Sequence, residues 1–490
     1  MDTRKILLLG GVFLLTALAA PAQEPKGSAP HGANLTPEQI TASVVGAMDP
    51  AVDPCADFYR YSCGGWLGSA KIPSDRSRWV RSFSVIDERN QVFVRKLLED
   101  AGATVKSGGA ADPDTARIGQ YYAACMDEAA VEKAGAGPLK PWLVKVGETK
   151  TARDLLALTG ELYRHGVEPL FSFGPIPDFK RPDWMIAGFS QGGIGMPDRD
   201  YYVSEDPKKK ELLAAYEKHV ARMLGLLGEP AEQAAKSARA IVAFETELAK
   251  ASRPRAEMRD PEKRYNKLDV AGLQKLAPKL DWKVFLEAAG YPRITEANIA
   301  VPGFFEALDK TATAAPPETL QAYLRWSLVN TAADFLSKDF VDANFEFYGK
   351  TLGGQAELEP RWKRCVDMTE AALGEAIGKL YVEREFAGDS KQKALQMIHD
   401  IEDAFAANLP DLAWMDDETR KRALEKRDAV GNKIGYPDKW RDYSTLKVTP
   451  NDFFANVAAA TSFEFKRQLD KVGKPVDKTE WGMTPQTVNA

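Results

Sequence analysis

Histidine is the side chain best suited to ligate a metal or to move protons near neutral pH, and this chain has four. None of them stands in an H-x-x-x-H or H-x-x-E-H spacing. His31 lies in a Pro- and Gly-rich segment, His165 precedes a glycine where helix capping is usual, and His219 and His399 lie on amphipathic helices. A metal site needs three or four converging ligands. We therefore predict no metal ligands and no catalytic residues among these histidines.

Other catalytic patterns are equally hard to find. A Ser-His-Asp or Cys-His site would be recognised by geometry that the sequence hides. Acidic pairs such as Asp198 with Asp200, or Glu245 with Glu247, could support acid–base hydrolysis as in a glycosidase. Because the chain has 70 acidic residues, we expect such pairs to be solvated faces or caps.

The cysteines form a more distinctive pattern. Cys55 and Cys63 lie in Asp53-Pro-Cys-Ala-Asp-Phe-Tyr-Arg-Tyr-Ser-Cys-Gly-Gly-Trp66, with three aromatic residues between them. Pro54 and the Gly64-Gly65 pair predict a short amphipathic helix with these residues as its limits. Such a helix is marginal alone, so packing, disulfides or both must hold it. The surroundings of the cysteines are aromatic rather than basic, which favours structural roles.

The first 22 residues indicate the compartment. Arg4 and Lys5 precede an apolar run, Ile6 to Ala20, and the small residues Ala20-Pro21-Ala22 follow. This is the pattern of a secretory signal peptide; an uncleaved N-terminal anchor is the alternative. We predict an exported protein that is periplasmic, extracellular or on the outer face of the cell membrane. The net charge of −5, without a basic stripe, argues against nucleic acid as a partner.

The rest of the chain predicts a mainly α fold with little sheet. Residues 23–46 lack periodicity and are expected to form a flexible leader. Two strands, at 169–173 and 184–189, flank a Pro- and Asp-rich turn at 175–182 and predict a small β-hairpin. The apolar spacing predicts one large multi-helix domain, with its main helices at 84–100, 118–125, 151–164, 206–227, 229–252, 270–276, 282–289, 303–312, 316–343, 358–382, 390–408, 418–429 and 450–472.

Seven blocks of sequence carry a family resemblance, in one order from about residue 47 to the end. With them the chain resembles the N-terminal helical domain of the neprilysin family of zinc endopeptidases, peptidase family M13. The blocks are Asp53 to Trp66, Ile72-Pro-Ser-Asp-Arg-Ser-Arg-Trp79, Tyr121-Tyr-Ala-Ala-Cys-Met-Asp127, Gly195-Met-Pro-Asp-Arg-Asp-Tyr-Tyr202, Tyr265-Asn-Lys-Leu268, Arg361-Trp-Lys-Arg-Cys365 and Gly482-Met-Thr-Pro-Gln-Thr-Val-Asn-Ala490.

The resemblance implies that zinc is bound by a separate catalytic domain. Family members bind zinc through H-E-x-x-H and a downstream Glu, and this sequence has neither part. Residues 47–480 correspond to the N-terminal domain, and 481–490 to the start of the catalytic domain. Asn489 and Ala490 match a strand that holds the backbone of a peptide substrate. We therefore expect a fragment or truncated product that binds no zinc by itself.

The family's N-terminal domain caps a cavity that admits only short peptides. Some members hold a substrate's C-terminal carboxylate with arginines after the cysteine pair. Arg78 or Arg81 matches the first of these arginines, whereas Asp87 stands at the second, so we do not count them as site residues. The family's pairing implies a Cys125–Cys365 disulfide. The partners of Cys55 and Cys63 would lie in the missing catalytic domain, so these two should be unpaired or mispaired.

These observations lead to one functional expectation and two alternatives. We expect the cap portion of an exported zinc-dependent metalloendopeptidase that hydrolyses short peptides, inactive without its catalytic domain. A stand-alone exported helical protein that binds peptides without cutting them is the first alternative. A hydrolase that uses a carboxylate pair is the second, supported only by the acidic pairs above.

Overall fold

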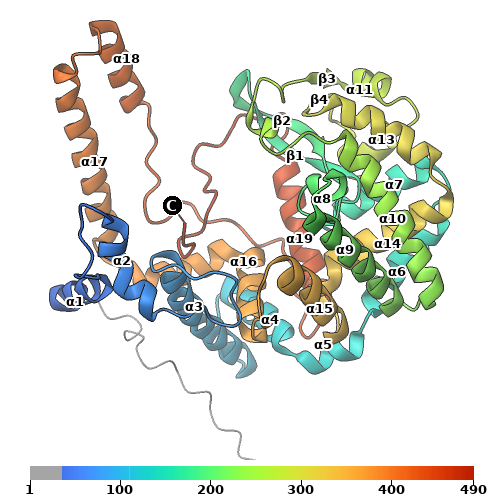
Figure 1. The fold of residues 1–490 in the computed structure, drawn as a ribbon, viewed down its shortest axis with the longest axis horizontal. Coiled ribbons are helices and arrows are strands. Elements are labelled where there is room, and N and C mark those ends of the chain that lie inside the picture. The colour runs from blue at the N-terminus through green and yellow to red at the C-terminus, as the bar shows by residue number, and fades with distance from the viewer. Residues whose placement is uncertain (1–35, 110, 490) are drawn as a thin grey trace, which may run out of the picture. The chain divides into compact units, whose positions relative to one another are not determined.

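The structure, a computed structural model, describes residues 36–109 and 111–489. The chain divides into two compact units, with the boundary between Gly65 and Trp66. As predicted, the fold is mainly α-helical with one small sheet (Figure 1). The predicted signal peptide at 1–22 lies outside the described residues, as do residues 23–35 of the predicted leader and Ala490.

The first unit contains helix α1 (Pro37–Ala47) and most of α2 (Phe58–Ser69). Part of the predicted leader is therefore helical, and Thr36 and Gln39 form a capping box at its start. Both predicted limits of the second helix were wrong, because α2 begins at Phe58 rather than at Pro54 and runs through Gly64 and Gly65. A Cβ atom at Gly65 would lie 2.5 Å from the backbone oxygen of Met48, so the glycine allows close packing inside the helix.

The second unit holds the remaining helices. In chain order they are α3 (Phe83–Lys106), α4 (Pro113–Met126), α5 (Glu128–Ala134), α6 (Lys140–Glu148), α7 (Ala152–Tyr163), α8 (Asp200–Val203), α9 (Pro207–Leu226), α10 (Ala231–Ala251), α11 (Val270–Leu276), α12 (Trp282–Ala288), α13 (Pro302–Ala314), α14 (Pro317–Ala332), α15 (Lys338–Asn344), α16 (Arg361–Glu385), α17 (Ser390–Asn408), α18 (Asp417–Asp428) and α19 (Phe453–Leu469). Every helix predicted by apolar spacing is present, although one of them is divided.

The divided helix is the one predicted at 316–343. It ends at Ala332, and a 3-10 turn (Ala333–Phe335) separates α14 from α15. Leu336 adopts an extended backbone there and is buried. A π-helical segment, η4 (Phe345–Leu352), follows α15. The sequence remains apolar across this break, so helical periodicity alone does not reveal it.

The sheet is larger than the predicted hairpin. Its strands are β1 (Phe171–Asp178), β2 (Arg181–Gln191), β3 (Lys267–Asp269) and β4 (Glu296–Ile299), in the order β1-β2-β4-β3. β1 and β2 form the predicted antiparallel hairpin, whereas β4 lies parallel to β2 with Ala187 opposite Ala297. The predicted turn at 175–182 was too long, because Pro175 and Pro177 belong to β1. That strand is at the sheet edge, where proline is tolerated.

Two hydrophobic clusters form the core of the second unit. The larger one surrounds the sheet and includes Phe171, Trp282 and Phe305. The smaller one joins α4, α16 and α19, and includes Tyr121 and the half-cystines Cys125 and Cys365. α19 contacts both β1 and α16, so it spans the seam between the two clusters (Figure 1).

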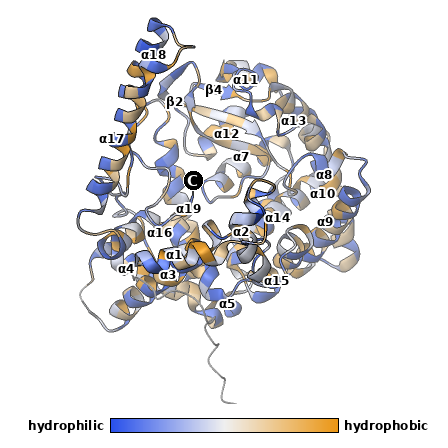
Figure 2. Ribbon diagram, turned by 60° about the vertical axis from the view of Figure 1, so that its left-hand side comes forward, coloured by the Kyte–Doolittle hydropathy of each residue, from blue (hydrophilic) through white to orange (hydrophobic). Residues whose placement is uncertain are grey.

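Helices α17 and α18, like α2 in the first unit, bury no residue. α17 carries apolar residues along its length (Figure 2), and Met397 and Ile401 are each 59% exposed. None of the helices among the described residues is long and apolar enough to cross a membrane.

Candidate functional site

One pocket lies where α3, α16, α19 and the last described segment meet. It has a volume of about 720 Å³ and is lined mainly by polar and charged side chains. We call it the charged pocket. Asp87, Glu370, Glu375, Arg441, Glu464, Arg467, Lys471, Asp477 and Glu480 are its charged residues. Six acids against three bases give the lining an excess of negative charge.

A kink in α16 positions one wall of this pocket. Leu373 departs from helical geometry, with φ −132° and ψ 27°. The backbone N–H of Glu375 donates to the hydroxyl of Tyr443 at 3.3 Å, and the carbonyl of Gly374 accepts from Nε2 of Gln486 at 3.0 Å. At the kink, these backbone groups of α16 therefore bond to side chains of other segments instead of to backbone groups of the same helix. This interruption of the helical hydrogen bonds explains the kink.

The same contacts hold the C-terminal segment in place. Asn90 on α3 donates from Nδ2 to the backbone carbonyl of Gln486 at 2.9 Å. A Cβ atom at Gly374 would lie 2.8 Å from Cγ2 of Thr484, so glycine there lets the segment approach α16 closely. Residues 484–486 are therefore attached to both α16 and α3.

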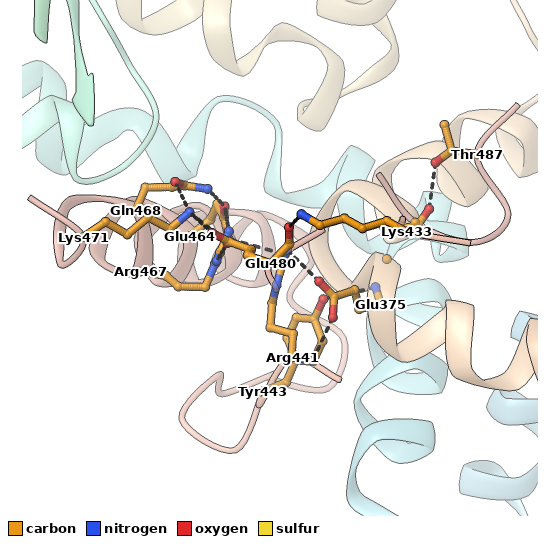
Figure 3. A network of polar contacts seen from close by, with 12 residues as sticks. Glu375, Lys433, Arg441, Tyr443, Glu464, Arg467, Gln468, Lys471, Glu480 and Thr487 are labelled. Atoms are coloured by element: carbon orange, nitrogen blue, oxygen red, sulfur yellow. Dashed lines mark hydrogen bonds and ion pairs between the residues drawn. The ribbon is translucent and has the colours of Figure 1, made fainter. Parts of the chain in front are cut away.

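An ion-pair network crosses the charged pocket (Figure 3). Arg441 lies 2.9 Å from Glu375 and 3.5 Å from Glu464, while Arg467 binds Glu464 at 2.7 Å and also pairs with Glu480. Burial opposes the charge of Glu464, but hydrogen bonds and charges from its neighbours outweigh burial and lower its pKa to about 2. All three bases of the pocket are engaged, because Lys471 binds Glu480 at 2.7 Å.

Two acids beside the network behave differently. Burial and neighbouring carboxylates raise the pKa of Glu370 to about 7, even though a hydrogen bond from Gln486 opposes this shift. Burial and Glu359 raise the pKa of Asp367 to about 6, against a hydrogen bond from Gln91. These groups can hold or release a proton near neutral pH. The sequence showed no sign of them, because nothing separates them from the other acids before the chain is folded.

A second pocket lies beside α3 and has a volume of about 580 Å³. We call it the arginine pocket; its lining includes Arg76, Arg78, Asp87, Val488 and Asn489. Arg76 is engaged by Glu359 at 2.5 Å and by Gln91 at 2.8 Å. Burial works against its charge, but Glu359, Glu88 and Asp87 outweigh it and raise its pKa. Arg78, by contrast, is exposed and has no ion pair with another described residue.

The structure brings the predicted substrate residue Asn489 into this pocket. Its Nδ2 lies 3.4 Å from Sδ of Met483, a weak contact that leaves the amide carbonyl oxygen without a partner among the described residues. Its predicted neighbour Ala490 lies outside the described residues. Asn489 and Arg78 therefore line one pocket, although 411 positions separate them in the sequence.

The histidines lie in unrelated places. The His165 ring packs against Trp142 at 4.8 Å, and His399 lies 3.0 Å from Glu402 on an exposed helix. His219 is buried and stacked on Phe347, and burial lowers its pKa to about 3. His31 lies outside the described residues.

The acidic pairs are engaged by other side chains, and one of their members differs from our expectation. Asp198 and Asp200 bind nearby arginines, Arg255 and Arg199. Glu247 is exposed beside Lys250, but Glu245 is fully buried, so the prediction of a solvated face was wrong for it. Its carboxylate accepts hydrogen bonds from Tyr202 at 2.7 Å and from Tyr216 at 2.9 Å.

The cysteines divide into a linked pair and two free thiols. A disulfide joins Cys125 on α4 to Cys365 on α16, the pair that the family resemblance implied. In the first unit Cys55 is exposed and Cys63 is half-buried, and neither forms a disulfide. Within residues 36–109 and 111–489, no three His, Cys, Asp or Glu side chains converge to hold a metal.

Comparison with known proteins gives these pockets a family context. The model of peptidase family M13, in its N-terminal part, matches residues 54–437. Human endothelin-converting enzyme 1 is 35% identical over 472 residues, covering 92% of this chain and 60% of the relative. Neprilysin-3 of Drosophila melanogaster is 32% identical over 479 residues, with the same two coverages of 92% and 60%. The chain thus spans about 60% of the length of these relatives.

Solved structures agree with the sequence matches. The zinc metalloprotease ZMP1 of Mycobacterium tuberculosis, solved with an inhibitor, superposes with a TM-score of 0.84 and 36% identity, covering 94% of this chain and 68% of that one. Its open state gives a TM-score of 0.78 and covers 89% of this chain and 67% of that one. Sequence and fold lead to the same conclusion: the chain belongs to peptidase family M13 and contains the N-terminal domain of that family.

Proposed function

We propose that this chain is the cap portion of an exported zinc-dependent metalloendopeptidase that hydrolyses short peptides. Residues 47–480 form the cap, and 481–490 begin the catalytic part. The relatives support this reading, because their names describe a zinc metalloprotease and an enzyme that converts endothelin, a peptide. Export follows from the signal-peptide pattern at 1–22.

The observation that carries the proposal is that Arg78 and Asn489 line one pocket. A peptide needs partners for its backbone amides and for its terminal carboxylate. The Asn489 amide offers a donor and an acceptor to the backbone, and an unpaired guanidinium such as that of Arg78 can bind a carboxylate through two parallel hydrogen bonds. By the family resemblance, Ala490 would bind the same peptide backbone.

Zinc would supply the hydrolytic chemistry in the whole enzyme by polarising the scissile carbonyl and activating water. The described residues of this chain do not fit zinc, since they contain no suitable group of ligands, and the sequence contains no H-E-x-x-H. We therefore assign zinc binding to another part of the whole enzyme. The 490-residue chain alone should not cleave peptides.

Two measurements test this assignment. The first is zinc analysis of the purified 490-residue protein together with a peptide-cleavage assay; stoichiometric zinc with chelator-sensitive cleavage would refute the inactivity. The second is the genomic sequence after codon 490. A reading frame that continues into H-E-x-x-H supports the proposal, whereas an authentic stop codon favours a stand-alone peptide-binding protein.

The role of Arg78 is tested by Arg78→Ala. We expect at least tenfold weaker binding of a short peptide with a free C-terminal carboxylate, and no change for the same peptide with an amidated C-terminus. Arg239→Ala is the matched control, because Arg239 is exposed on α10 and has no ion pair among the described residues. Equal losses for both peptides would contradict a carboxylate-binding role.

A further inference from the structure

A third pocket lies at the seam between the two hydrophobic clusters. It has a volume of about 440 Å³, and its walls come from α4, α7, β1, α16 and α19. We call it the apolar pocket; Tyr121, Tyr163, Phe173, Met368 and Phe465 are among its large side chains. It shares Ala371, Glu464 and Gln468 with the charged pocket, so the two pockets adjoin. Its volume suits a compact organic group.

Two tyrosine hydroxyls in this pocket lack hydrogen bonds. Tyr163 is 1% exposed, and its hydroxyl has no hydrogen-bond partner, although the backbone N–H of Phe171 lies nearby without normal geometry. Tyr121 is 2% exposed, and no described residue hydrogen-bonds to it. Burial raises the pKa of both hydroxyls, so they are neutral and can donate or accept. The Tyr163 hydroxyl is thus a buried polar group without a partner, which is uncommon, and a polar ligand would satisfy it.

Glu168 adds an unpaired negative charge. It lies in the loop between α7 and β1, lines the apolar pocket, and makes no ion pair or hydrogen bond with any described residue. Its side chain is exposed at the pocket wall, yet partial desolvation still raises its pKa. Its charge also acts on the Tyr163 hydroxyl. The other carboxylate of the pocket, Glu464, is already bound to Arg467 and Arg441. Glu168 is therefore the anion available to a ligand.

The chemistry of a complementary ligand follows from these groups. Apolar and aromatic walls favour an apolar body, and aromatic faces also attract cations. One unpaired carboxylate calls for a positive charge, and an ammonium group has three donors, enough for Glu168 and for neighbouring hydroxyl oxygens. We propose that the apolar pocket binds a hydrophobic ammonium group, meaning an aromatic or branched aliphatic body of side-chain size that carries a protonated primary amine.

Two kinds of molecule have this chemistry: the N-terminal residue of a peptide and a free amine. Binding needs neither zinc nor peptide cleavage, so the inference does not depend on the function proposed above. The test uses 2-phenylethylamine, its neutral analogue 2-phenylethanol, the peptide Phe-Gly-Gly and N-acetyl-Phe-Gly-Gly. Binding of each to the 490-residue protein is measured by calorimetry and by ligand-observed NMR.

We expect 2-phenylethylamine to bind at least tenfold more tightly than 2-phenylethanol. Glu168→Gln should remove most of this difference, whereas Glu306→Gln, which alters an exposed and unpaired glutamate on α13, should preserve it. Ala371→Trp, at an exposed position on the pocket wall, should weaken both compounds. Because Glu168 and Ala371 are exposed, these variants should fold normally, which thermal unfolding checks.

The peptides distinguish the sources of the ligand. Binding of Phe-Gly-Gly but not of its acetylated form supports a peptide N-terminus as the ligand. Binding of 2-phenylethylamine without Phe-Gly-Gly supports a free amine. Equal binding of amine and alcohol, unchanged binding in Glu168→Gln, or no binding of the amine at millimolar concentration would each overturn the proposal.

Discussion

Lys363 on α16 binds Asp75, which lies 288 positions earlier in the chain, with 2.9 Å between Nζ and Oδ2. The Lys363 side chain is only 7% exposed, and it also binds Glu88 at 2.8 Å. This pair fixes the segment around Arg76 and Arg78 to α16. Residues 71–80 form neither a helix nor a strand, and the ion pair explains why this segment can still form the wall of a pocket.

Lys363→Met should therefore destabilise the second unit. Removing the cation leaves Asp75 without its ion pair and Glu88 with only Arg76, which costs about 2–3 kcal/mol after allowance for their partial exposure. Urea unfolding measures the loss. Lys236→Met is the control, because Lys236 is exposed and unpaired, and a change within about 0.5 kcal/mol is expected there. Equal effects of the two substitutions would show that the buried ion pair contributes nothing.

Glu245 should make stability depend on pH. Burial raises its pKa from 4.5 to about 7, despite opposing hydrogen bonds from Tyr202, Tyr216 and Trp326. The folded state therefore holds a proton between pH 4.5 and 7 that the unfolded state releases, so stability falls as pH rises through this window. The loss is at most about 3 kcal/mol.

The measurement for Glu245 is the free energy of unfolding at pH 5 and pH 8. Between these values the protein should lose stability relative to Glu245→Gln, whose side chain does not titrate. Glu247→Gln, two positions away and exposed, is the control and should follow the unaltered protein. Parallel pH profiles for all three proteins would mean that Glu245 does not titrate in this range.

Gly160 should not tolerate a side chain. A Cβ atom there would lie 2.6 Å from the backbone oxygen of Phe285, where α7 packs against α12. Gly160→Ala should cost more than 1 kcal/mol because one helix must move away from the other. Gly225→Ala on α9 is the control, since no atom lies within 4 Å of its Cβ position. That change should stabilise by about 0.5–1 kcal/mol, and chemical denaturation measures both.

The disulfide predicts a labelling pattern. Maleimide added under denaturing, non-reducing conditions should modify Cys55 and Cys63 only, giving two adducts by mass spectrometry. Replacing Cys125 and Cys365 with serine should lower stability by about 3–5 kcal/mol, because the bond closes a long loop in the unfolded chain. Four protected cysteines in a monomer would instead require a Cys55–Cys63 bond.

The sequence by itself determined the helical class, most helix positions, the β-hairpin and the family. Apolar residues at helical spacing must face a core, and this constraint is local enough to read along the chain. The seven ordered blocks identified the family before any fold was known. Local patterns failed where packing decided the outcome. The Gly64-Gly65 pair continues a helix because a backbone approaches it, and residues 267–269 and 296–299 become strands by pairing with each other and with β2.

The pockets were decided only by the tertiary structure. Arg78 and Asn489 come together because α3 and α16 both bind residues 484–486. The spacing of residues in the sequence predicts neither of these contacts. Nothing in the sequence distinguishes Glu168, Glu245 and Glu370 from the other acidic residues. The pKa of each is raised by desolvation, which exists only after the chain has folded.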